Sequence, residues 1–197
     1  REAWLLEYSV QDLAPRLFDL QLRKGTAVVE TQSNSVRIFR EITGKERVIF
    51  CGNVMIDSLL AHRNHARSAA DTLRAHDIDP LVLEHPKGYG VVTLHRPSNV
   101  DDPQTLRSLL VTLGDVAKDL PLVFAMHPRT RSNIDKLQLG ALVDPARLVL
   151  LPPQGYLEML GLMSGATLVL TDSGGLQEET TALGVPCLTL RANTERP

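Results

Sequence analysis

A serine followed by two glycines, Ser173-Gly174-Gly175, lies between an apolar run and an amphipathic segment. Where a strand passes into a helix, such a turn leaves backbone N–H groups unpaired at the positive end of the helix dipole, so an anion can bind there. Glu179 lies one helical turn after Gly175 on the same side, where its carboxylate could accept hydrogen bonds from hydroxyl groups of the same ligand. These residues predict a phosphate-and-sugar site, although Ser-Gly-Gly also forms ordinary turns.

The flanking residues predict the strand and the helix that position this turn. Leu168–Leu170 is short, apolar and rich in branched side chains, which is typical of a buried strand. After the glycines, Leu176, Thr180 and Leu183 recur at i, i+4 and i+7, so they form one helix face that can pack on a sheet. Gly184 is then placed to end the helix as a C-cap glycine.

Four other side chains are candidates for the same site, and each has an ordinary structural alternative. His95 could donate to a pyrophosphate oxygen or move a proton, or it could bond the backbone of its own loop. Gln154 could bond the edge of a base or satisfy a loop stiffened by two prolines. Met159 is, from its position alone, a core methionine. Arg196 could contact phosphate with two N–H groups, or pair with the neighbouring Glu195.

The composition narrows the class of protein. With 43% hydrophobic and 22% charged residues among 197, the chain has the make-up of a soluble globular protein. A formal net charge of −2 gives no electrostatic reason to expect nucleic acid or an acidic membrane surface as a partner. No stretch is long and apolar enough to cross a bilayer. Cys51 and Cys187 each lie in a predicted strand, which favours buried thiols over a disulfide and a reduced, cytoplasmic setting.

A regular alternation of strands and helices begins after Gly88. It predicts an α/β, Rossmann-like fold with a parallel sheet and helices on both faces. The predicted strands there are 90–94, 122–126, 148–151, 168–170 and 186–190, and the predicted helices there are 103–118, 131–139, 156–163 and 175–183. A further helix is predicted before this alternation, at 55–75. Earlier in the chain we expect strands at 26–30 and 47–51 and a helix at 33–42. The change of composition at Gly52-Asn53 predicts a boundary between residues 1–51 and residues 52–197.

Ligands of such sheets bind beyond the carboxyl ends of the strands. The polar candidates all follow predicted strands: His95-Arg96, His127-Pro128-Arg129, Gln154, Asp172-Ser173 and residues 191–196. Other chemistries find less support, because the sequence has no GxGxxG after a strand, no GxxxxGK[ST], no GxSxG and no zinc-ribbon cysteine spacing. His62 and His65 could hold a metal, but a solvated helix face explains them better.

Four segments together resemble the non-hydrolysing UDP-N-acetylglucosamine 2-epimerase family. They are GNVMID at 52–57, TLHR at 93–96, DSGGLQEE at 172–179 and NTERP at 193–197. The resemblance covers about three quarters of the chain, and DSGGLQEE followed at this distance by TERP is a specific signature. It implies that this chain is one half of a GT-B-type architecture, in which two Rossmann-like domains face a cleft. Residues 52–197 would be the carboxyl-terminal UDP-binding domain, truncated at its end, and residues 1–51 a remnant of the other domain.

The resemblance also implies an activity. The family interconverts UDP-GlcNAc and UDP-ManNAc by anti elimination of UDP, followed by re-addition to the other face of a 2-acetamidoglucal. It implies no cofactor and no metal, a place in cell-envelope polysaccharide biosynthesis, and a homodimer for the intact protein. The implied UDP-binding residues are Gln154, Met159, Ser173, Gly174, Gly175, Glu179 and Arg196, with His95 as the catalytic residue. Since elimination leaves negative charge on UDP, hydrogen-bond donors aimed at that charge lower the barrier.

Roles within this set follow from the matched positions. The serine–glycine turn would hold the phosphates, and Glu179 would accept the ribose hydroxyls. His95 and Arg196 would stabilise the diphosphate leaving group. Gln154 would lie along the uridine, and Met159 stands where the family commonly has a phenylalanine against uracil.

The resemblance lacks one part. The family's acidic residues that move protons at the sugar belong to the amino-terminal half, and no counterparts are found in this sequence. We therefore expect this chain alone to bind uridine nucleotides weakly or not at all and not to epimerise, and the intact protein to epimerise. A GT-B-type glycosyltransferase that uses a UDP-sugar and a stand-alone nucleotide-sugar-binding domain are the alternatives.

Overall fold

The computed structural model describes residues 53–191. The chain divides into two compact units, Arg1–Asp57 and Ser58–Pro197, and the fold below is that of the second. The elements expected at 26–30, 33–42 and 47–51 lie outside the described residues.

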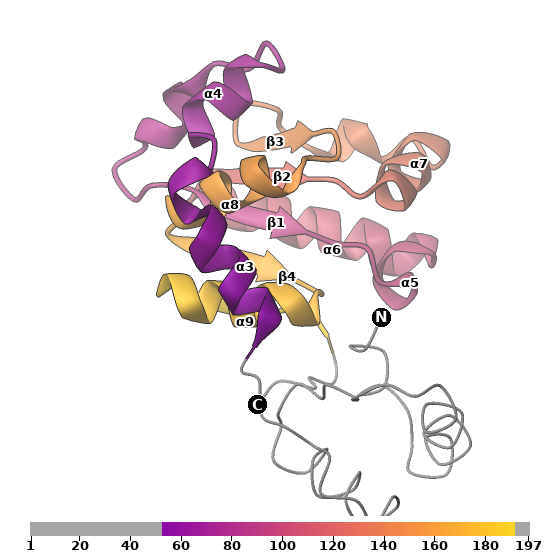
Figure 1. The fold of residues 1–197 in the computed structure, drawn as a ribbon. Helices are drawn as coiled ribbons and strands as arrows, with labels where there is room; N and C mark the ends of the chain where they lie inside the picture. The colour runs from indigo at the N-terminus through magenta and orange to yellow at the C-terminus, as the bar shows by residue number, and fades with distance from the viewer. Residues whose placement is uncertain (1–52, 192–197) are drawn as a thin grey trace, which may run out of the picture. The chain divides into compact units, whose positions relative to one another are not determined.

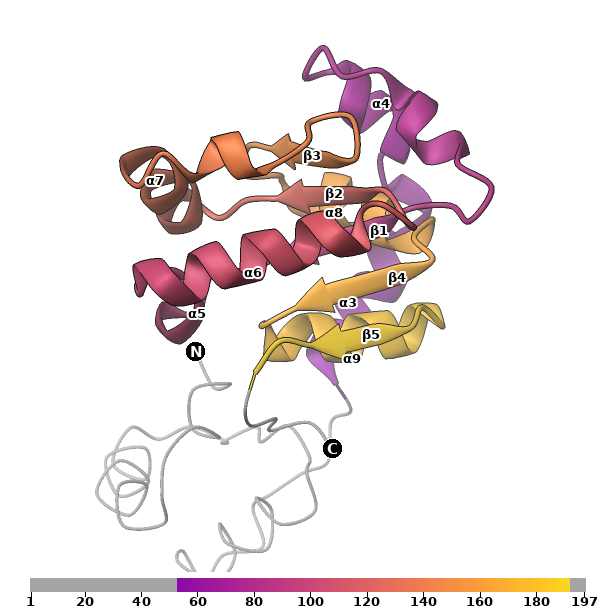
Figure 2. The ribbon, with the colours of Figure 1, turned by 180° about the vertical axis from the view of Figure 1, so that it is seen from behind.

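Five short strands form one parallel sheet (Figure 2). They are β1 (Gly90–Thr93), β2 (Leu122–Ala125), β3 (Leu148–Leu151), β4 (Leu168–Thr171) and β5 (Cys187–Thr189). Their order across the sheet is β3-β2-β1-β4-β5, and every neighbouring pair is parallel. The predicted parallel sheet is therefore confirmed, with strand ends shifted by one residue in four of the five strands.

The strands place alternate side chains in two separate hydrophobic layers. The register aligns Val91 with Val123 of β2 and Val169 of β4, and these valines belong to one buried cluster. The next position along, Val92, aligns with Phe124, and both belong to the other buried cluster. Because both faces of a parallel sheet are covered, its strands consist of continuous apolar runs, as these do.

Helices cover both faces, as predicted (Figures 1 and 2). α6 (Pro103–Val116) and α7 (Pro128–Lys136) pack on one face with the short α5 (Pro97–Val100). α4 (Ala69–Arg74), α8 (Tyr156–Ser164) and α9 (Gly174–Leu183) pack on the other. None of the helices in the part of the chain that the structure describes has the length and apolar character needed to span a membrane.

The prediction of one helix over 55–75 is wrong. The structure has α3 (Val54–His62), a 3₁₀ turn η2 (Arg63–His65) and then α4. Ser68 starts α4 anew, since its hydroxyl oxygen accepts a hydrogen bond from the Asp71 N–H at 3.0 Å. The intervening segment is held elsewhere, because the Arg67 N–H donates to the Leu157 carbonyl at 3.1 Å.

The prediction for α7 is wrong at both ends. The helix begins three residues before the expected 131, because Pro128 occupies its first turn and the His127 ring caps it by accepting from the Arg129 N–H at 3.2 Å. It ends three residues early, since Gln138 adopts a left-handed φ of 54°. The sequence analysis also missed α5 and the 3₁₀ turns η3 (Pro80–Glu84) and η4 (Leu139–Leu142), which are too short to show a hydrophobic period.

Candidate functional site

The carboxyl ends of β1 and β4 lie side by side at the point where the strand order reverses. On one side of β1 the sheet continues to β2 and β3, and on the other it continues to β4 and β5. The helices that follow these two central strands pack on opposite faces of the sheet, and open α/β sheets bind ligands in the crevice at such a point. His95 follows β1 and Ser173 follows β4, so the fold brings two predicted site residues to one place.

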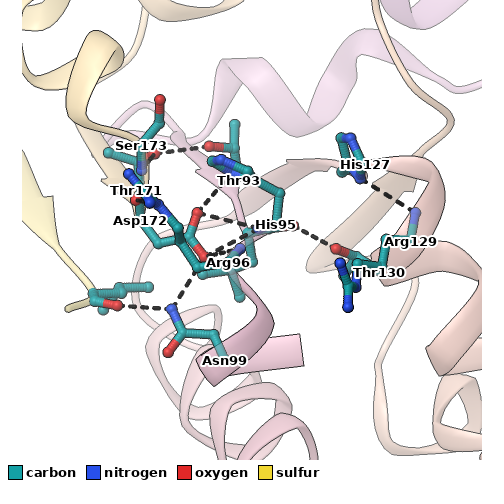
Figure 3. A network of polar contacts seen from close by, with 12 residues as sticks. Thr93, His95, Arg96, Asn99, His127, Arg129, Thr130, Thr171, Asp172 and Ser173 are labelled. Atoms are coloured by element: carbon teal, nitrogen blue, oxygen red, sulfur yellow. Dashed lines mark hydrogen bonds and ion pairs between the residues drawn. The ribbon is translucent and has the colours of Figure 1, made fainter. Parts of the chain in front are cut away.

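The serine–glycine turn is fixed by the ends of both strands. Thr93 and Thr171 are paired in the register, and their hydroxyl oxygens lie 2.8 Å apart. The Ser173 N–H donates to the Thr171 hydroxyl at 3.0 Å (Figure 3). Ser173 is the N-cap of α9, yet its side chain makes no capping hydrogen bond to the helix. The first turn of α9, which begins with Gly174 and Gly175, is thus presented with its N-cap hydroxyl available to a ligand.

Asp172, between the strand and the turn, is fully buried and accepts hydrogen bonds from the opposite loop (Figure 3). Its carboxylate receives the backbone N–H of His95 at 3.0 Å and that of Arg96 at 2.9 Å. The Asn99 amide donates to it at 3.0 Å and also to the Leu190 carbonyl at 2.8 Å. One carboxylate therefore joins the loops after β1 and β4 and, through Asn99, the residue after β5.

The same carboxylate orients the His95 ring. His95 Nδ1 lies 2.8 Å from Asp172 Oδ1, and 38% of the histidine side chain is exposed. With Nδ1 committed to the carboxylate, Nε2 is the ring nitrogen left to meet a ligand. The ring of His127 lies nearby, with 5.9 Å between the centroids.

Two opposing effects act on the pKa of Asp172. Burial raises it, while hydrogen bonds from the His95 ring, the Arg96 backbone and the Asn99 amide lower it. The hydrogen bonds outweigh burial, and the pKa of Asp172 lies below its ordinary value. Asp172 is therefore ionised at neutral pH and would balance a positive charge on His95.

A cavity of about 360 Å³ opens at this edge of the sheet. Five of the predicted site residues line it: His95, Gln154, Met159, Ser173 and Glu179. Gly174 and Gly175 form the adjoining turn of α9, and Arg196 lies outside the described residues. A larger cavity of about 690 Å³ is lined by residues such as Pro121 and Arg147, which precede β2 and β3, so it lies at the amino-terminal ends of the strands, away from these groups.

Glu179 is largely buried beside the cavity, with 7% of its surface exposed. Burial raises its pKa, and the negative charge of Glu178 acts in the same direction. A hydrogen bond from the Tyr156 hydroxyl opposes this by favouring the carboxylate. Tyr156 also lines the cavity, so Glu179 is a poorly solvated carboxylate that needs hydroxyl donors.

Gln154 and Met159 each lie where they could contact a ligand and also make an ordinary structural contact. Gln154 lines the cavity, but its amide also donates to the Pro152 carbonyl at 2.8 Å. Met159 packs against a hydrophobic cluster and also lines the cavity. No group of three or more His, Cys, Asp or Glu side chains within residues 53–191 is placed to hold a metal. His62, one of the two histidines considered for a metal, instead places Nδ1 2.7 Å from the Ser58 carbonyl.

Comparison with known proteins decides the family. A family model described as UDP-N-acetylglucosamine 2-epimerase matches residues 26–197. The chain belongs to this family. A relative from Methanococcus maripaludis with the same name is 34% identical over 170 residues, which is 85% of this chain and 45% of the relative. The chain thus spans less than half the length of this epimerase.

Two further similarities bear on the site. The UDP-2,3-diacetamido-2,3-dideoxy-D-glucuronate 2-epimerase of Pseudomonas aeruginosa is 38% identical over 150 residues, covering 76% of this chain and 38% of that protein. The solved structure of the Methanocaldococcus jannaschii UDP-GlcNAc 2-epimerase in complex with UDP-GlcNAc and UDP is 33% identical, with a TM-score of 0.65, over 86% of this chain and 46% of that one. The predicted fold class, one half of a GT-B-type architecture, is confirmed.

The sequence analysis of this epimerase-family chain missed two residues of the candidate site. Asp172 was noted only for its position after a strand, although an acidic residue between a buried strand and a glycine turn is a signal for a buried hydrogen-bond acceptor. Tyr156 was noted only as the start of a helix. No spacing rule connects it to Glu179, because the contact depends on how α8 and α9 pack.

Proposed function

We propose that the complete protein containing this chain is a non-hydrolysing UDP-N-acetylglucosamine 2-epimerase that interconverts UDP-GlcNAc and UDP-ManNAc. The observation that carries the proposal is the cavity that joins His95, Ser173 and Glu179 at the carboxyl ends of β1 and β4. The similarity to epimerases, one of them solved with UDP-GlcNAc and UDP, supports it.

The proposed nucleotide contacts match the chemistry of the cavity. Ser173, Gly174 and Gly175 bind the phosphates with a hydroxyl and backbone N–H groups at the start of α9. Glu179 accepts the ribose hydroxyls, which replace the water that burial denies it. Gln154 and Met159 lie against the uridine, one through its amide and the other through its apolar side chain. Arg196 completes the site by binding the diphosphate.

The proposed chemistry places negative charge next to these donors. Loss of the C2 proton and cleavage of the C1–O bond release UDP and leave a 2-acetamidoglucal. His95 Nε2 donates to the diphosphate, while Asp172 holds Nδ1 and balances the charge of the ring. UDP then adds back, and a proton is delivered to C2 on the other face.

The acid and base at the sugar come, in this proposal, from the amino-terminal half of the complete protein. Residues 52–197 are the UDP-binding domain, and residues 1–51 are the end of the other domain. This chain alone then lacks the groups that move the C2 proton, and we expect it not to epimerise. We also propose that the complete protein is a cytoplasmic homodimer, which light scattering after size-exclusion chromatography and cell fractionation test.

A second substrate has a specific observation in its favour. The Pseudomonas aeruginosa relative is named for a diacetamido-glucuronate sugar. The chemistry at C2 is the same for both sugars, and a nucleotide site like this one serves either. Turnover of both UDP-sugars by the complete protein decides which is the better substrate.

The test is incubation of the complete protein with UDP-GlcNAc in deuterated water. Formation of UDP-ManNAc with deuterium at C2 is the expected result. UDP release that depends on an acceptor, with no deuterium at C2, would instead support a GT-B-type glycosyltransferase. Binding of UDP-GlcNAc without either reaction would support a nucleotide-sugar-binding protein.

A further inference from the structure

His76 and Gln154 are in contact although 78 residues separate them in the sequence. His76 Nε2 lies 3.0 Å from Gln154 Nε2 and 3.3 Å from Gln154 Oε1. His76 lies outside the segments that carry the family resemblance, and the mechanism above does not use it.

The orientation of the Gln154 amide follows from its second contact. Its nitrogen lies 2.8 Å from the Pro152 carbonyl oxygen. Since a carbonyl only accepts, the amide nitrogen must face Pro152, and the amide cannot rotate by half a turn without losing this bond. A His76 ring whose Nε2 carries no proton accepts a hydrogen bond from the second N–H of Gln154 Nε2. The amide oxygen then remains as the group that a ligand can meet.

The backbone at the end of α4 holds His76 in place. The His76 N–H donates to the Leu73 carbonyl at 2.9 Å, and the Ile78 N–H donates to the same carbonyl at 3.1 Å. Between them Asp77 adopts a left-handed φ of 57°, which turns the chain back on itself. Leu73 is itself fully buried.

α4 in turn is tied to α8, the helix that follows Gln154. The segment before α4 crosses α8 closely, because the Arg67 N–H donates to the Leu157 carbonyl at 3.1 Å. A side chain at Gly161 would overlap the Arg67 carbonyl oxygen, so only glycine permits this approach. Arg67 also pairs with Glu158 at 3.7 Å. Through these contacts α4 holds His76 against the loop that carries Gln154.

The geometry points to His76 as a positioning residue that presents the Gln154 amide oxygen to the nucleobase, and so favours uracil over cytosine. This rests on the proposed function. Uracil carries an N–H at N3, which an amide oxygen can accept, whereas cytosine carries a lone pair at N3. Without His76 the second N–H of Gln154 is free to donate to N3 of cytosine, while the oxygen still accepts from N3 of uracil, so the preference for uracil weakens.

The experiment measures UDP and CDP binding by titration calorimetry on the complete protein. The variants are His76→Ala, Gln154→Ala and the double substitution, and the control is His65→Ala, another exposed histidine, in the 3₁₀ turn η2. We expect each single substitution to weaken UDP binding about fivefold to tenfold, the usual effect of one lost hydrogen bond, and to lower the UDP/CDP affinity ratio. The double variant should match Gln154→Ala, and all melting temperatures without nucleotide should agree.

Each outcome has one meaning. An unchanged UDP/CDP affinity ratio in His76→Ala overturns the role of His76. So does an equal loss of UDP affinity when His76→Ala is introduced into the unaltered protein and into Gln154→Ala. If Gln154→Ala binds UDP normally while Glu179→Ala does not, the base contact is wrong but the proposed function stands. If the unaltered protein does not bind UDP, the proposed function itself fails.

Discussion

At the scale of single residues, the site depends on a carboxylate that does not face the ligand. Asp172 is fully buried, and its carboxylate oxygens accept hydrogen bonds from His95, Arg96 and Asn99. In the proposed mechanism it acts on the ligand through the His95 ring that it orients. The chemistry at the crevice is thus determined one layer below the surface.

Replacement of Asp172 by Asn should impair both folding and turnover. The amide would place an N–H group against several donors, and we expect a loss of about 2–4 kcal/mol of stability. The pKa of Asp172 is below its ordinary value, so its ionised form stabilises the fold above about pH 4 and that contribution is lost as the pH falls through the folded-state pKa. Urea unfolding between pH 3 and 7 should therefore show that the free energies of unfolding of the unaltered protein and of Asp172→Asn approach each other as the pH falls. A difference that stays constant with pH contradicts this account.

At Glu179, in contrast to Asp172, a substitution should raise the stability of the fold while it weakens UDP binding. Its pKa is raised, so the protonated form suits the folded state, and stability is lost as the pH rises through the folded-state pKa. Glu179→Gln should unfold at a higher temperature at neutral pH, yet bind UDP about 1 kcal/mol more weakly, because a charged acceptor is stronger. Glu179→Ala should lose about 1–3 kcal/mol of binding. Calorimetry on the complete protein measures both, and unchanged UDP affinity in the alanine variant would remove Glu179 from the ribose site.

Tyr156→Phe isolates the hydroxyl that supports Glu179. This hydroxyl lowers the pKa of Glu179, so its removal should raise that pKa further. The proposed ribose contact needs the carboxylate. As the pH is lowered, UDP binding by the variant should therefore weaken at a higher pH than binding by the unaltered protein. Affinities measured from pH 5 to 8 follow the shift, and identical pH profiles would show that Tyr156 does not act through Glu179.

At the residue scale, the sequence could relate candidate residues only where one segment of the chain contained them. Helical spacing alone related Glu179 to Gly175 of the serine–glycine turn, and Ser173 and Glu179 both line the cavity. The pairing of His95 with Asp172 could not be derived, because it depends on β1 and β4 being neighbours. The described residues do not test the roles assigned to these side chains.

At the scale of elements, helix α9 met the sequence expectations within one residue, since it begins at Gly174 and ends at Leu183. Thr180 is fully buried, Leu176 and Leu183 pack on the sheet, and Gly184 ends the helix with a left-handed φ of 73°. Its signals were all local. The break between α3 and α4 was missed although Ser68 is a local N-cap, and the contact that holds the segment before it lies on another helix, where Gly161 of α8 leaves room for the Arg67 backbone.

Two glycines in helices allow this to be tested with matched substitutions. Gly161→Ala should destabilise the protein by about 1–3 kcal/mol, since the added methyl group overlaps the Arg67 carbonyl. Gly114→Ala, in the last turn of α6, should stabilise it by about 0.5–1 kcal/mol, because the nearest atom to its methyl group lies 4.0 Å away and alanine is the better helix former. Thermal unfolding distinguishes them, and a stabilising Gly161→Ala would show that the segment before α4 does not depend on α8.

At the scale of the whole molecule, the parallel order of the sheet creates the crevice before any side chain is considered. The sequence pattern was enough to predict a parallel sheet with two covered faces. It contained no information on the order of the strands, because that depends on long-range pairing. The order is what places the loops after β1 and β4 together.

Binding of UDP should stabilise the complete protein in proportion to its affinity. At a UDP concentration 100 times the dissociation constant the gain is about 2.7 kcal/mol. Hydrogen exchange should slow most at the amides that begin α9, Gly174 and Gly175, since these are the proposed phosphate donors. ADP at the same concentration is the control. Protection spread evenly over the sheet, with none at α9, would argue against a phosphate site there.

The buried Asp172 has a consequence for genetic experiments. Because this carboxylate both aims the histidine and fastens neighbouring loops, variants at this position change the amount of folded protein and its turnover together. A growth selection would score such variants as one class. Measuring protein abundance in the same cells separates the two effects, and substitutions at His95, whose ring is partly exposed, supply the reference for a loss of turnover at normal abundance.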